Sequence, residues 1–366
     1  MTPAARIEAV IGLLSGILVD TKPADACLSS YFRTRRYIGS KDRAAISQKL
    51  FRILRSYHRL SWHIGAVQAM ADARALVIAD LLLNREHSAI SLDEAFSGEG
   101  YAPKPLSAKE KELAAILEKK ALTDSGMPEQ VRLECPAWAY AALQESLGGR
   151  LEAEMKAMMT QAPLDLRVNA IKATREEVLS ALKEEGIVAA PGRLSPVSVR
   201  LEERAQITRH PLYTDGLVEI QDEGSQMVAV IADAKPGEQV ADFCAGAGGK
   251  TLALAAMMQN KGRIVALDVL ARRLEKAKLR FRRAGVHNIE TRALDEKAEK
   301  WLKRQRGHFD LVLVDAPCTG TGTWRRAPDQ RWRQLGPSLD ELLSLQRDIL
   351  QKAALMVRPG GRLVYA

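Results

Sequence analysis

The stretch DFCAGAGGKT, residues 242–251, decides the fold expected for the second half of the chain. It is a glycine-rich turn that follows an apolar run and precedes a run with helical spacing. From residue 216 onward, short apolar runs alternate with longer helical patterns, which predicts a parallel, doubly wound α/β sheet. Strands are predicted at 238–243, 263–268, 287–292, 309–314 and 362–366, and helices at 224–233, 249–259, 270–284 and 338–356.

Three kinds of ligand-binding loop can be compared with this stretch. A phosphate-binding loop requires a glycine where Cys244 stands, and a dinucleotide fingerprint requires one where Thr251 stands, so both patterns fail. The pattern D-x-G-x-G-x-G of an S-adenosylmethionine loop fits Asp242, Gly246 and Gly248, with Cys244 replacing its first glycine. Glycines at these positions let the backbone approach a ligand closely.

An acidic residue at the end of the next predicted strand strengthens this interpretation. Asp268 lies 20 residues beyond Gly248, where a carboxylate would bind a ribose diol. The alternative is a tight strand-to-helix turn without any ligand. The two features together favour a nucleoside cofactor, and NAD and S-adenosylmethionine remain open at this point.

A second motif follows in FDLVLVDAPCTGTGTWRRAPDQRWR, residues 309–333. An apolar strand runs into Asp315 and Cys318, which places both residues at the carboxyl edge of the sheet, where such folds bind ligands. A cysteine after a proline on a glycine-rich loop is poorly explained by core packing. Cys318 is therefore a candidate reactive thiol, and a buried structural cysteine is the alternative.

The chain is basic, with a formal net charge of +9, which makes nucleic acid a natural partner. Residues 33–59 carry nine Lys and Arg against one Asp, with aromatic residues interleaved nearby. Cations bind phosphates and rings stack on bases, so this composition is typical of RNA contact, although a solvated helix face is the alternative. The expected RNA-binding residues are Arg33, Arg35, Arg36, Arg325, Arg326, Arg331, Trp332 and Arg333.

The first half of the chain has a different organisation. Residues 1–90 show helical spacing of apolar residues, residues 91–111 resemble a long loop, and a helix pair extends to about residue 147. Residues 163–201 then predict a small α/β unit. Its LDLRVN segment alternates like a strand, and Thr174 with Glu177 forms a capping box at the start of a helix.

Several classes of protein are disfavoured. The sequence has no apolar run of 18 residues, so no membrane span is expected. Its four cysteines are scattered without zinc-ligand or disulfide spacing, which fits a reducing cytoplasm and no metal. A monomer is expected.

Taken together, these motifs resemble the Sun/Nop family of RNA cytosine-5 methyltransferases, and in particular its bacterial RsmB-like ribosomal RNA enzymes. The resemblance covers nearly the whole chain, including GSKDRAAISQKLFRILR, LRVNAIKATREEVLSALKEEGI and GLVEIQDEGSQMVA. It implies three domains: a NusB-like all-α RNA-binding domain at 1–147, a small RRM-like α/β domain at 151–215, and a Rossmann-like class I methyltransferase domain at 216–366. The last strands of the methyltransferase sheet are expected to be absent.

The resemblance also implies the chemistry of the site. In this family a thiolate adds to C6 of cytosine, C5 then takes the methyl group of S-adenosylmethionine, and loss of the C5 proton and the thiol gives 5-methylcytosine. Asp315 is expected to lie beside the cofactor and the target base and to help hold the base, which makes Asp315 and Cys318 the expected catalytic residues. The expected cofactor-binding residues are Cys244, Ala245, Gly246, Ala247, Gly248, Gly249, Lys250, Asp268, Asp295 and Asp315.

The sequence departs from the family pattern in two places. Gly246-Ala247 stand where the family has Ala-Pro, which should loosen the loop slightly. The family also continues the strand GGRLVYA with Thr-Cys-Ser, whose cysteine attacks C6, while the cysteine matching Cys318 helps to release the product. We therefore expect a truncated enzyme, and the rival hypothesis makes Cys318 the nucleophile. The codons after Ala366 would separate these two hypotheses.

Two functions are alternatives to methyl transfer. The chain could be an RNA-binding protein with an inactive methyltransferase-like domain, in which case a calorimetric titration with S-adenosylmethionine would show no binding. An NAD oxidoreductase would leave DAPCTGTG and RRAPDQRWR unexplained.

Overall fold

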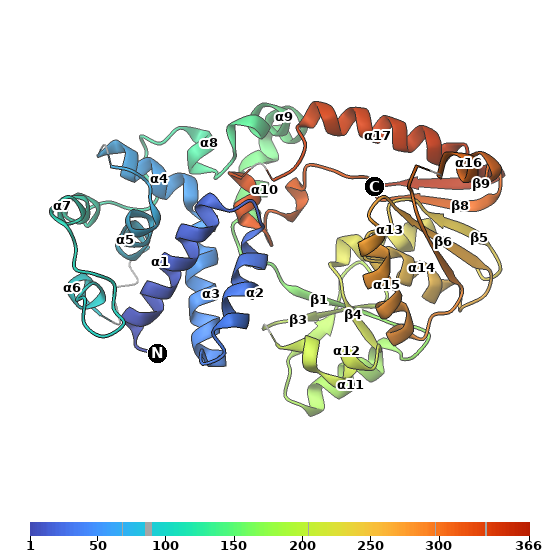
Figure 1. The fold of residues 1–366 in the computed structure, drawn as a ribbon, viewed down its shortest axis with the longest axis horizontal. Coiled ribbons are helices and arrows are strands. Elements are labelled where there is room, and N and C mark those ends of the chain that lie inside the picture. The colour runs from blue at the N-terminus through green and yellow to red at the C-terminus, as the bar shows by residue number, and fades with distance from the viewer. Residues whose placement is uncertain (68, 85–89, 204, 297, 334) are drawn as a thin grey trace. The chain divides into compact units, whose positions relative to one another are not determined.

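A computed structural model describes residues 1–67, 69–84, 90–203, 205–296, 298–333 and 335–366 (Figure 1). The chain divides into two compact units. The helical unit contains Met1–Ala162 together with Gly320–Pro337, and the α/β unit contains Pro163–Thr319 together with Ser338–Ala366.

The buried side chains of the helical unit form a large apolar core and a smaller second cluster. Thr2 caps the first helix and Pro3 occupies its first turn, a position that tolerates the missing N–H of proline. Val10, Leu14 and Ile17 of this helix are fully buried, as the helical spacing predicts. The helices are α1 Pro3–Val19, α2 Ala24–Thr34, α3 Ser40–Arg55, α4 Tyr57–Ala66, α5 Ala73–Leu83, α6 Leu92–Ala95, α7 Ala108–Leu117, α8 Glu129–Arg132, α9 Ala137–Leu147 and α10 Leu151–Met158.

The prediction of a continuous loop over residues 91–111 is wrong at both ends. Ser91 and Glu94 form a capping box that starts α6, and Ser107 and Glu110 form another that starts α7. In each box the serine hydroxyl accepts from the third backbone N–H while the glutamate accepts from the serine N–H. Local capping therefore outweighs the loop-like composition of this stretch.

The helical unit does not end at residue 147, the boundary predicted from the glycine pair. Gly148 and Gly149 lie in a 3-10 turn, Gly148–Arg150, between α9 and α10. Leu151 and Met155 of α10 pack with Leu133 and Cys135 in a core cluster of this unit. The two glycines provide a turn between packed helices and do not act as a domain linker.

The segment Gly320–Pro337 also belongs to the helical unit, although the sequence places it inside the methyltransferase domain. It forms two 3-10 turns, η3 Thr321–Thr323 and η4 Pro328–Arg331. Trp324 and Arg331 in this segment are fully buried. The segment is thus a structural part of the helical core.

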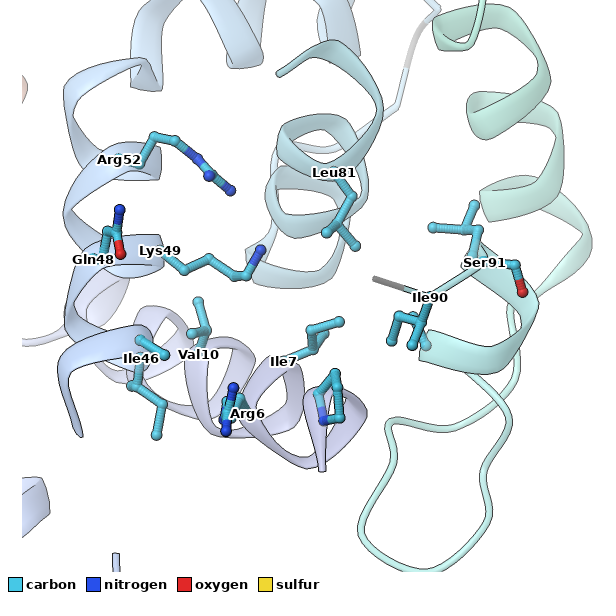
Figure 2. Close-up of a pocket in the computed structure, with 14 residues that line it drawn as sticks. Arg6, Ile7, Val10, Ile46, Gln48, Lys49, Arg52, Leu81, Ile90 and Ser91 are labelled. Carbon is cyan, nitrogen blue, oxygen red and sulfur yellow. The ribbon is translucent and has the colours of Figure 1, made fainter. Parts of the chain in front are cut away.

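A cavity of about 340 Å³ lies inside the helical unit, between α1, α3 and α5 and the start of α6 (Figure 2). Figure 2 shows Ile7, Val10 and Ile46 on its apolar side and Arg52 directed across it. Arg52 is half-buried and donates to both carboxylate oxygens of the buried Asp80. Among the lining residues, Lys49 and Arg52 belong to the basic stretch 33–59 for which RNA contact is predicted.

The α/β unit begins with a small antiparallel sheet in the order β2-β3-β1-β4. Its strands are β1 Leu164–Val168, β2 Ala189–Pro191, β3 Ser198–Leu201 and β4 Val218–Ile220, and its helices are α11 Arg175–Glu184 and α12 Pro211–Thr214. The strands at β1 and β3 and the Thr174 cap of α11 confirm the predicted α/β pattern. The sheet also includes β4, beyond the predicted boundary at residue 215, because Leu166 pairs with Ile220.

A parallel sheet in the order β7-β6-β5-β8-β9 follows, which confirms the doubly wound prediction. Apolar side chains on one face pack against α13, α14 and α15, and those on the other face pack against α16 and α17 (Figure 1). The strands are β5 Gln239–Asp242, β6 Arg263–Asp268, β7 Ile289–Ala293, β8 Phe309–Val314 and β9 Val357–Tyr365. The helices are α13 Glu223–Ala232, α14 Gly249–Met257, α15 Ala271–Ala284, α16 Ala298–Arg304 and α17 Leu339–Ala354.

The structure adds two features that the alternating pattern did not predict. Helix α16 lies between β7 and β8, and β9 begins five residues before the predicted strand at 362–366. The early part of β9 contains Pro359 and Gly360, and its pairing with β8 is irregular between Phe309 and Leu311. Over the described ranges, no helix combines the length and the apolar character needed to cross a membrane.

Candidate active site

Three aspartates lie at the carboxyl edge of the parallel sheet. Asp242 ends β5, Asp268 ends β6, and Asp315 directly follows β8. Because β6, β5 and β8 are adjacent in the sheet, their carboxyl ends bring the two sequence motifs together. This edge is where ligands bind in folds of this class.

The glycine-rich loop crosses this edge between β5 and α14. Gly246 and Gly248 have φ values of 56° and 79°, a left-handed conformation that favours glycine. A Cβ at Gly248 would lie 2.5 Å from the Phe281 ring, whereas a Cβ at Gly246 would meet no atom within 4 Å. The loop is therefore packed against α15 at Gly248 and open at Gly246, where a ligand can approach the backbone.

Asp268 fixes this loop to the neighbouring strand. One of its carboxylate oxygens accepts from the Gly246 N–H at 2.9 Å, and the other accepts from the Leu270 N–H at 2.7 Å. Asp268 is only 5% exposed. Since each carboxylate oxygen has further lone pairs, Asp268 can shape the loop and still accept from a ribose hydroxyl, so the predicted ribose contact stays a prediction.

Asp242 is a buried acid at the base of the loop. One carboxylate oxygen accepts from the Thr251 hydroxyl at 2.7 Å. The other is buried and has no hydrogen-bond partner among the residues that the structure describes. Burial raises the pKa of Asp242 to about 6, against the lowering effect of the Thr251 hydrogen bond. A buried acceptor without a partner fits a ligand that brings a donor to this position.

Lys250 and Asp315 join the two motifs directly. The Lys250 ammonium, in the first turn of α14, lies 2.5 Å from a carboxylate oxygen of Asp315. The Lys250 side chain is 14% exposed and that of Asp315 is 42% exposed. Asp315 is thus held at the loop while part of its surface stays open to a substrate.

Cys318 is the exposed cysteine of the four. Its loop is held by Gln346 of α17, which donates to the Pro317 carbonyl at 2.8 Å. Cys244 is half-buried, and burial together with the nearby Asp242 raises the pKa of its thiol to about 12. Cys135 is buried, and burial raises the pKa of its thiol to about 11. A thiolate reaction at neutral pH therefore favours Cys318 over these two.

Asp295 lies near the same edge, just after β7. The N–H of the preceding residue, Leu294, donates to the Asp268 carbonyl at 2.9 Å, which ties this segment to the end of β6. Asp295 is exposed. Its predicted contact with the cofactor stays a prediction. In the part of the chain that the structure describes, no cluster of His, Cys, Asp and Glu could hold a metal ion.

Two arginines of the RRAPDQRWR segment, Arg331 and Arg333, are buried and are not free to bind RNA as predicted. Arg331 is fully buried and donates to the Met158 carbonyl at the end of α10. Arg333 is 9% exposed and donates to the Asp20 and Lys22 carbonyls beyond the end of α1. The RNA-binding prediction is therefore wrong for Arg331 and Arg333, because their charges serve helix C-termini.

Trp332 has a similar structural role. Its ring stacks on Tyr57 with ring centroids 4.0 Å apart, and its indole N–H donates to the Leu54 carbonyl near the end of α3. Tyr57 covers one face of the ring, and the predicted contact of the half-buried Trp332 with RNA stays a prediction. Arg325 and Arg326 are half-buried, and their RNA contact stays a prediction.

The basic group at the end of α2 is accessible. Arg33 and Arg36 are exposed, and the Arg35 guanidinium lies 4.0 Å from the centroid of the Tyr31 ring. Exposed cations beside an aromatic ring are typical of RNA-binding surfaces, and RNA contact by these three arginines stays a prediction.

The sequence reasoning missed Arg167, Glu219 and Arg280. These charged residues lie in the α/β unit and contact the glycine-rich loop or each other. The alternating LDLRVN pattern indicates that Arg167 shares one face of a strand with Asp165, but it does not reveal that this face is covered.

Known proteins and family models are similar to this chain over both the glycine-rich loop and the DAPC segment. A family model described as 16S rRNA methyltransferase RsmB/F matches residues 229–366, and a model of the RsmF/B-like ferredoxin-like domain matches residues 135–208. The ribosomal RNA small subunit methyltransferase B of Serratia proteamaculans is 28% identical over 350 residues, which are 91% of this chain and 80% of that protein.

Two solved structures are also similar. A methyltransferase homolog protein from Pyrococcus horikoshii is 31% identical, with a TM-score of 0.56, and the match covers 66% of this chain and 77% of that one. The structure of PH0851 is 25% identical, with a TM-score of 0.78, and the match covers 100% of this chain and 86% of that one. With its glycine-rich loop and DAPC segment joined at one sheet edge, the chain belongs to the RsmB/F family of methyltransferases.

Proposed function

We propose that the chain transfers a methyl group from S-adenosylmethionine to C5 of a cytosine in small-subunit ribosomal RNA, through a covalent cysteine adduct. The observation that carries this proposal is the Lys250–Asp315 ion pair, which joins the glycine-rich loop to the loop of the exposed Cys318. The names of the relatives support a ribosomal RNA substrate.

The residues present fit the proposed cofactor. Gly246 leaves open space over the loop backbone, Asp268 offers a carboxylate for ribose hydroxyls, and Asp242 offers a buried oxygen that has no partner among the described residues. When bound, S-adenosylmethionine supplies a methyl group on a sulfonium that leaves as a neutral thioether.

The chain's own residues would act on the base. A cysteine thiolate adds to C6, which makes C5 nucleophilic enough to take the methyl group. The C5 proton then leaves to a base, and the thiol is eliminated to restore the aromatic ring. Asp315, held by Lys250 and partly exposed, would bind the amine edge of a cytosine that has left its stack. Cys318 would act either as the attacking thiol or as the residue that releases the product.

We also propose that the helical unit is a NusB-like RNA-binding domain. Arg33, Arg35 and Arg36 would contact RNA phosphates there, and Tyr31 would contribute an aromatic surface beside them.

The test is methyl transfer from radiolabelled S-adenosylmethionine to unmodified 16S ribosomal RNA, with bisulfite sequencing to locate 5-methylcytosine. Incorporation of label at a cytosine is expected. Binding of RNA without any binding of S-adenosylmethionine would overturn the proposal in favour of an RNA-binding protein with an inactive methyltransferase-like domain.

The role of Cys318 is tested with Cys318→Ser, with Cys27→Ser of the helical unit as the matched control. Accumulation of covalent protein–RNA complex would assign product release to Cys318, with a second cysteine attacking C6. Loss of both the complex and the methyl transfer would assign the attack to Cys318 itself. Methyl transfer at the control rate would remove Cys318 from the mechanism.

A further inference from the structure

Arg167 of β1 is a buried cation that reaches the glycine-rich loop. It is 4% exposed, and one of its terminal nitrogens donates to the Gly249 carbonyl at 2.5 Å and to the Gln221 side-chain carbonyl. Burial lowers the pKa of Arg167 to about 10, against the raising effect of Glu219, so the guanidinium stays charged at neutral pH. A buried charge is costly unless polar groups of the fold surround it, and here its acceptors are the Gln221 side chain and the Gly249 carbonyl of the loop.

Glu219 connects Arg167 to a second arginine. Arg167 and Glu219 are direct neighbours across the β1–β4 ladder, and Glu219 is 2% exposed. The Glu219 carboxylate accepts from Arg280 of α15 at 2.9 Å and also from Arg283. Arg280 in turn donates from its other terminal nitrogen to the Ala247 carbonyl at 2.6 Å. Arg280, which is fixed by Glu219, and Arg167 thus hold the carbonyls on either side of Gly248.

The loop needs such external bonds to keep one shape. Two of its residues, Gly246 and Gly248, are glycines in the left-handed region, and glycine loses more conformational freedom on ordering than any other residue. Hydrogen bonds from charged donors are roughly twice as strong as neutral ones. The Arg167 and Arg280 bonds therefore set the position of the loop backbone before any ligand arrives.

We infer that Arg167 and Arg280 are positioning residues for the cofactor, and that the antiparallel sheet takes part in cofactor binding by holding the glycine-rich loop. This inference rests on the proposed function in one respect, namely that the loop binds S-adenosylmethionine. It gives the ferredoxin-like part of the chain a task in the methyltransferase site itself.

The first test is calorimetric titration of S-adenosylmethionine into the whole protein and its Arg167→Met, Arg280→Met and Arg200→Met variants. Arg200 is the matched control because it lies on β3 of the same sheet and pairs with Asp165 and Glu223. We expect the Kd to rise about tenfold or more for Arg167→Met and Arg280→Met, as for the loss of a charge-assisted bond. An Arg200→Met rise as large as theirs would overturn the inference.

The second test measures amide hydrogen exchange of residues 245–251 without any ligand. Faster exchange confined to this loop is expected in Arg167→Met and Arg280→Met and not in Arg200→Met. If the wild-type protein does not bind S-adenosylmethionine, the proposed function fails, while the exchange rates still decide whether the arginines hold the loop. Arg280 is partly exposed, so Arg280→Met provides the test if Arg167→Met does not fold. Unchanged exchange in a folded variant would overturn the inference.

Discussion

The carboxylate of Asp329 accepts a hydrogen bond from the backbone N–H of Ala24 at 3.0 Å, although the two residues are 305 positions apart. Ala24 begins α2, whose N-cap Pro23 makes no side-chain cap, so Asp329 supplies the missing acceptor from another part of the chain. The same carboxylate lies 3.1 Å from the buried Arg333 guanidinium, which serves the end of α1.

Asp329→Ala should destabilise the helical unit by about 2–4 kcal/mol, because it leaves a buried N–H without its acceptor and a buried guanidinium without its carboxylate partner. Urea unfolding at pH 7 measures this change. The control is Asp348→Ala, which removes an exposed ion pair with Lys352 and should cost less than about 1 kcal/mol. Equal effects of the two substitutions would contradict the capping role of Asp329.

The accessible and the buried arginines should behave in opposite ways toward RNA. Arg33→Ala combined with Arg36→Ala should weaken RNA binding and reduce the slope of log Kd against log salt by about 0.7 per lost contact, with little change in stability. Arg331→Ala should instead lower stability, because Arg331 bonds the end of α10 from inside the core. Fluorescence anisotropy across a salt series, with unfolding curves for each variant, separates the two effects. A reduced salt slope in a stable Arg331→Ala protein would show that Arg331 contacts RNA after all.

Asp242 should make stability depend on pH. Its folded-state pKa of about 6 lies above the ordinary value of 3.8, so the folded protein binds more protons, and its stability falls as pH rises between these two values. Asp242→Asn removes this penalty and keeps an acceptor for Thr251. Without ligand, it should be more stable than wild type above pH 6, by up to about 3 kcal/mol, and nearly equal near pH 4. Urea unfolding across this range tests the prediction, and a difference that does not change with pH would contradict it.

Two glycine substitutions in the loop should have different consequences. Gly248→Ala places a Cβ 2.5 Å from the Phe281 ring and 3.0 Å from the Ala277 Cβ, so it should reduce both stability and cofactor binding. Gly246→Ala has open space around its Cβ and should cost only about 1 kcal/mol for the left-handed backbone, yet obstruct the ligand. Thermal melting and calorimetric titration measured together test this contrast. Unchanged cofactor affinity in Gly246→Ala would mean that no ligand approaches this part of the loop.

The cysteines should react with iodoacetamide in a defined order. Cys318 is exposed and should be alkylated first, whereas Cys135 and Cys244 should react far more slowly, because burial raises the pKa of both thiols. Peptide mass spectrometry after timed quenching measures each rate, and Cys318→Ser identifies the fast site. Faster labelling of Cys244 than of Cys318 would show that the loop opens more than the structure indicates.

Much of the α/β unit could be predicted because its signals are local. The apolar runs ending at Asp242, Asp268 and Val314 form adjacent parallel strands, and Gly246 and Gly248 of the loop adopt positive φ values. The capping box at Thr174 likewise fixes the start of α11 from four consecutive residues. Such features depend on neighbours in sequence, so a pattern reveals them.

The RNA-binding predictions failed for Arg331 and Arg333, where the same composition serves another purpose. Arginine and tryptophan contact phosphates and bases, but they also bond carbonyls at helix ends, and no local pattern distinguishes the two uses. Arg331, Trp332 and Arg333 bond the ends of α10, α3 and α1, partners that lie far away in sequence.

The sequence by itself determined the parallel sheet, the glycine-rich loop and the placement of Asp315 and Cys318 at the edge of that sheet, because strand periodicity and glycine conformation are properties of consecutive residues. Only the tertiary structure decided that Gly320–Pro337 belongs to the helical unit and that Arg167 and Arg280 hold the loop. The physical reason is that burying a charge depends on which partners surround it, and those partners are assembled only when distant segments pack together.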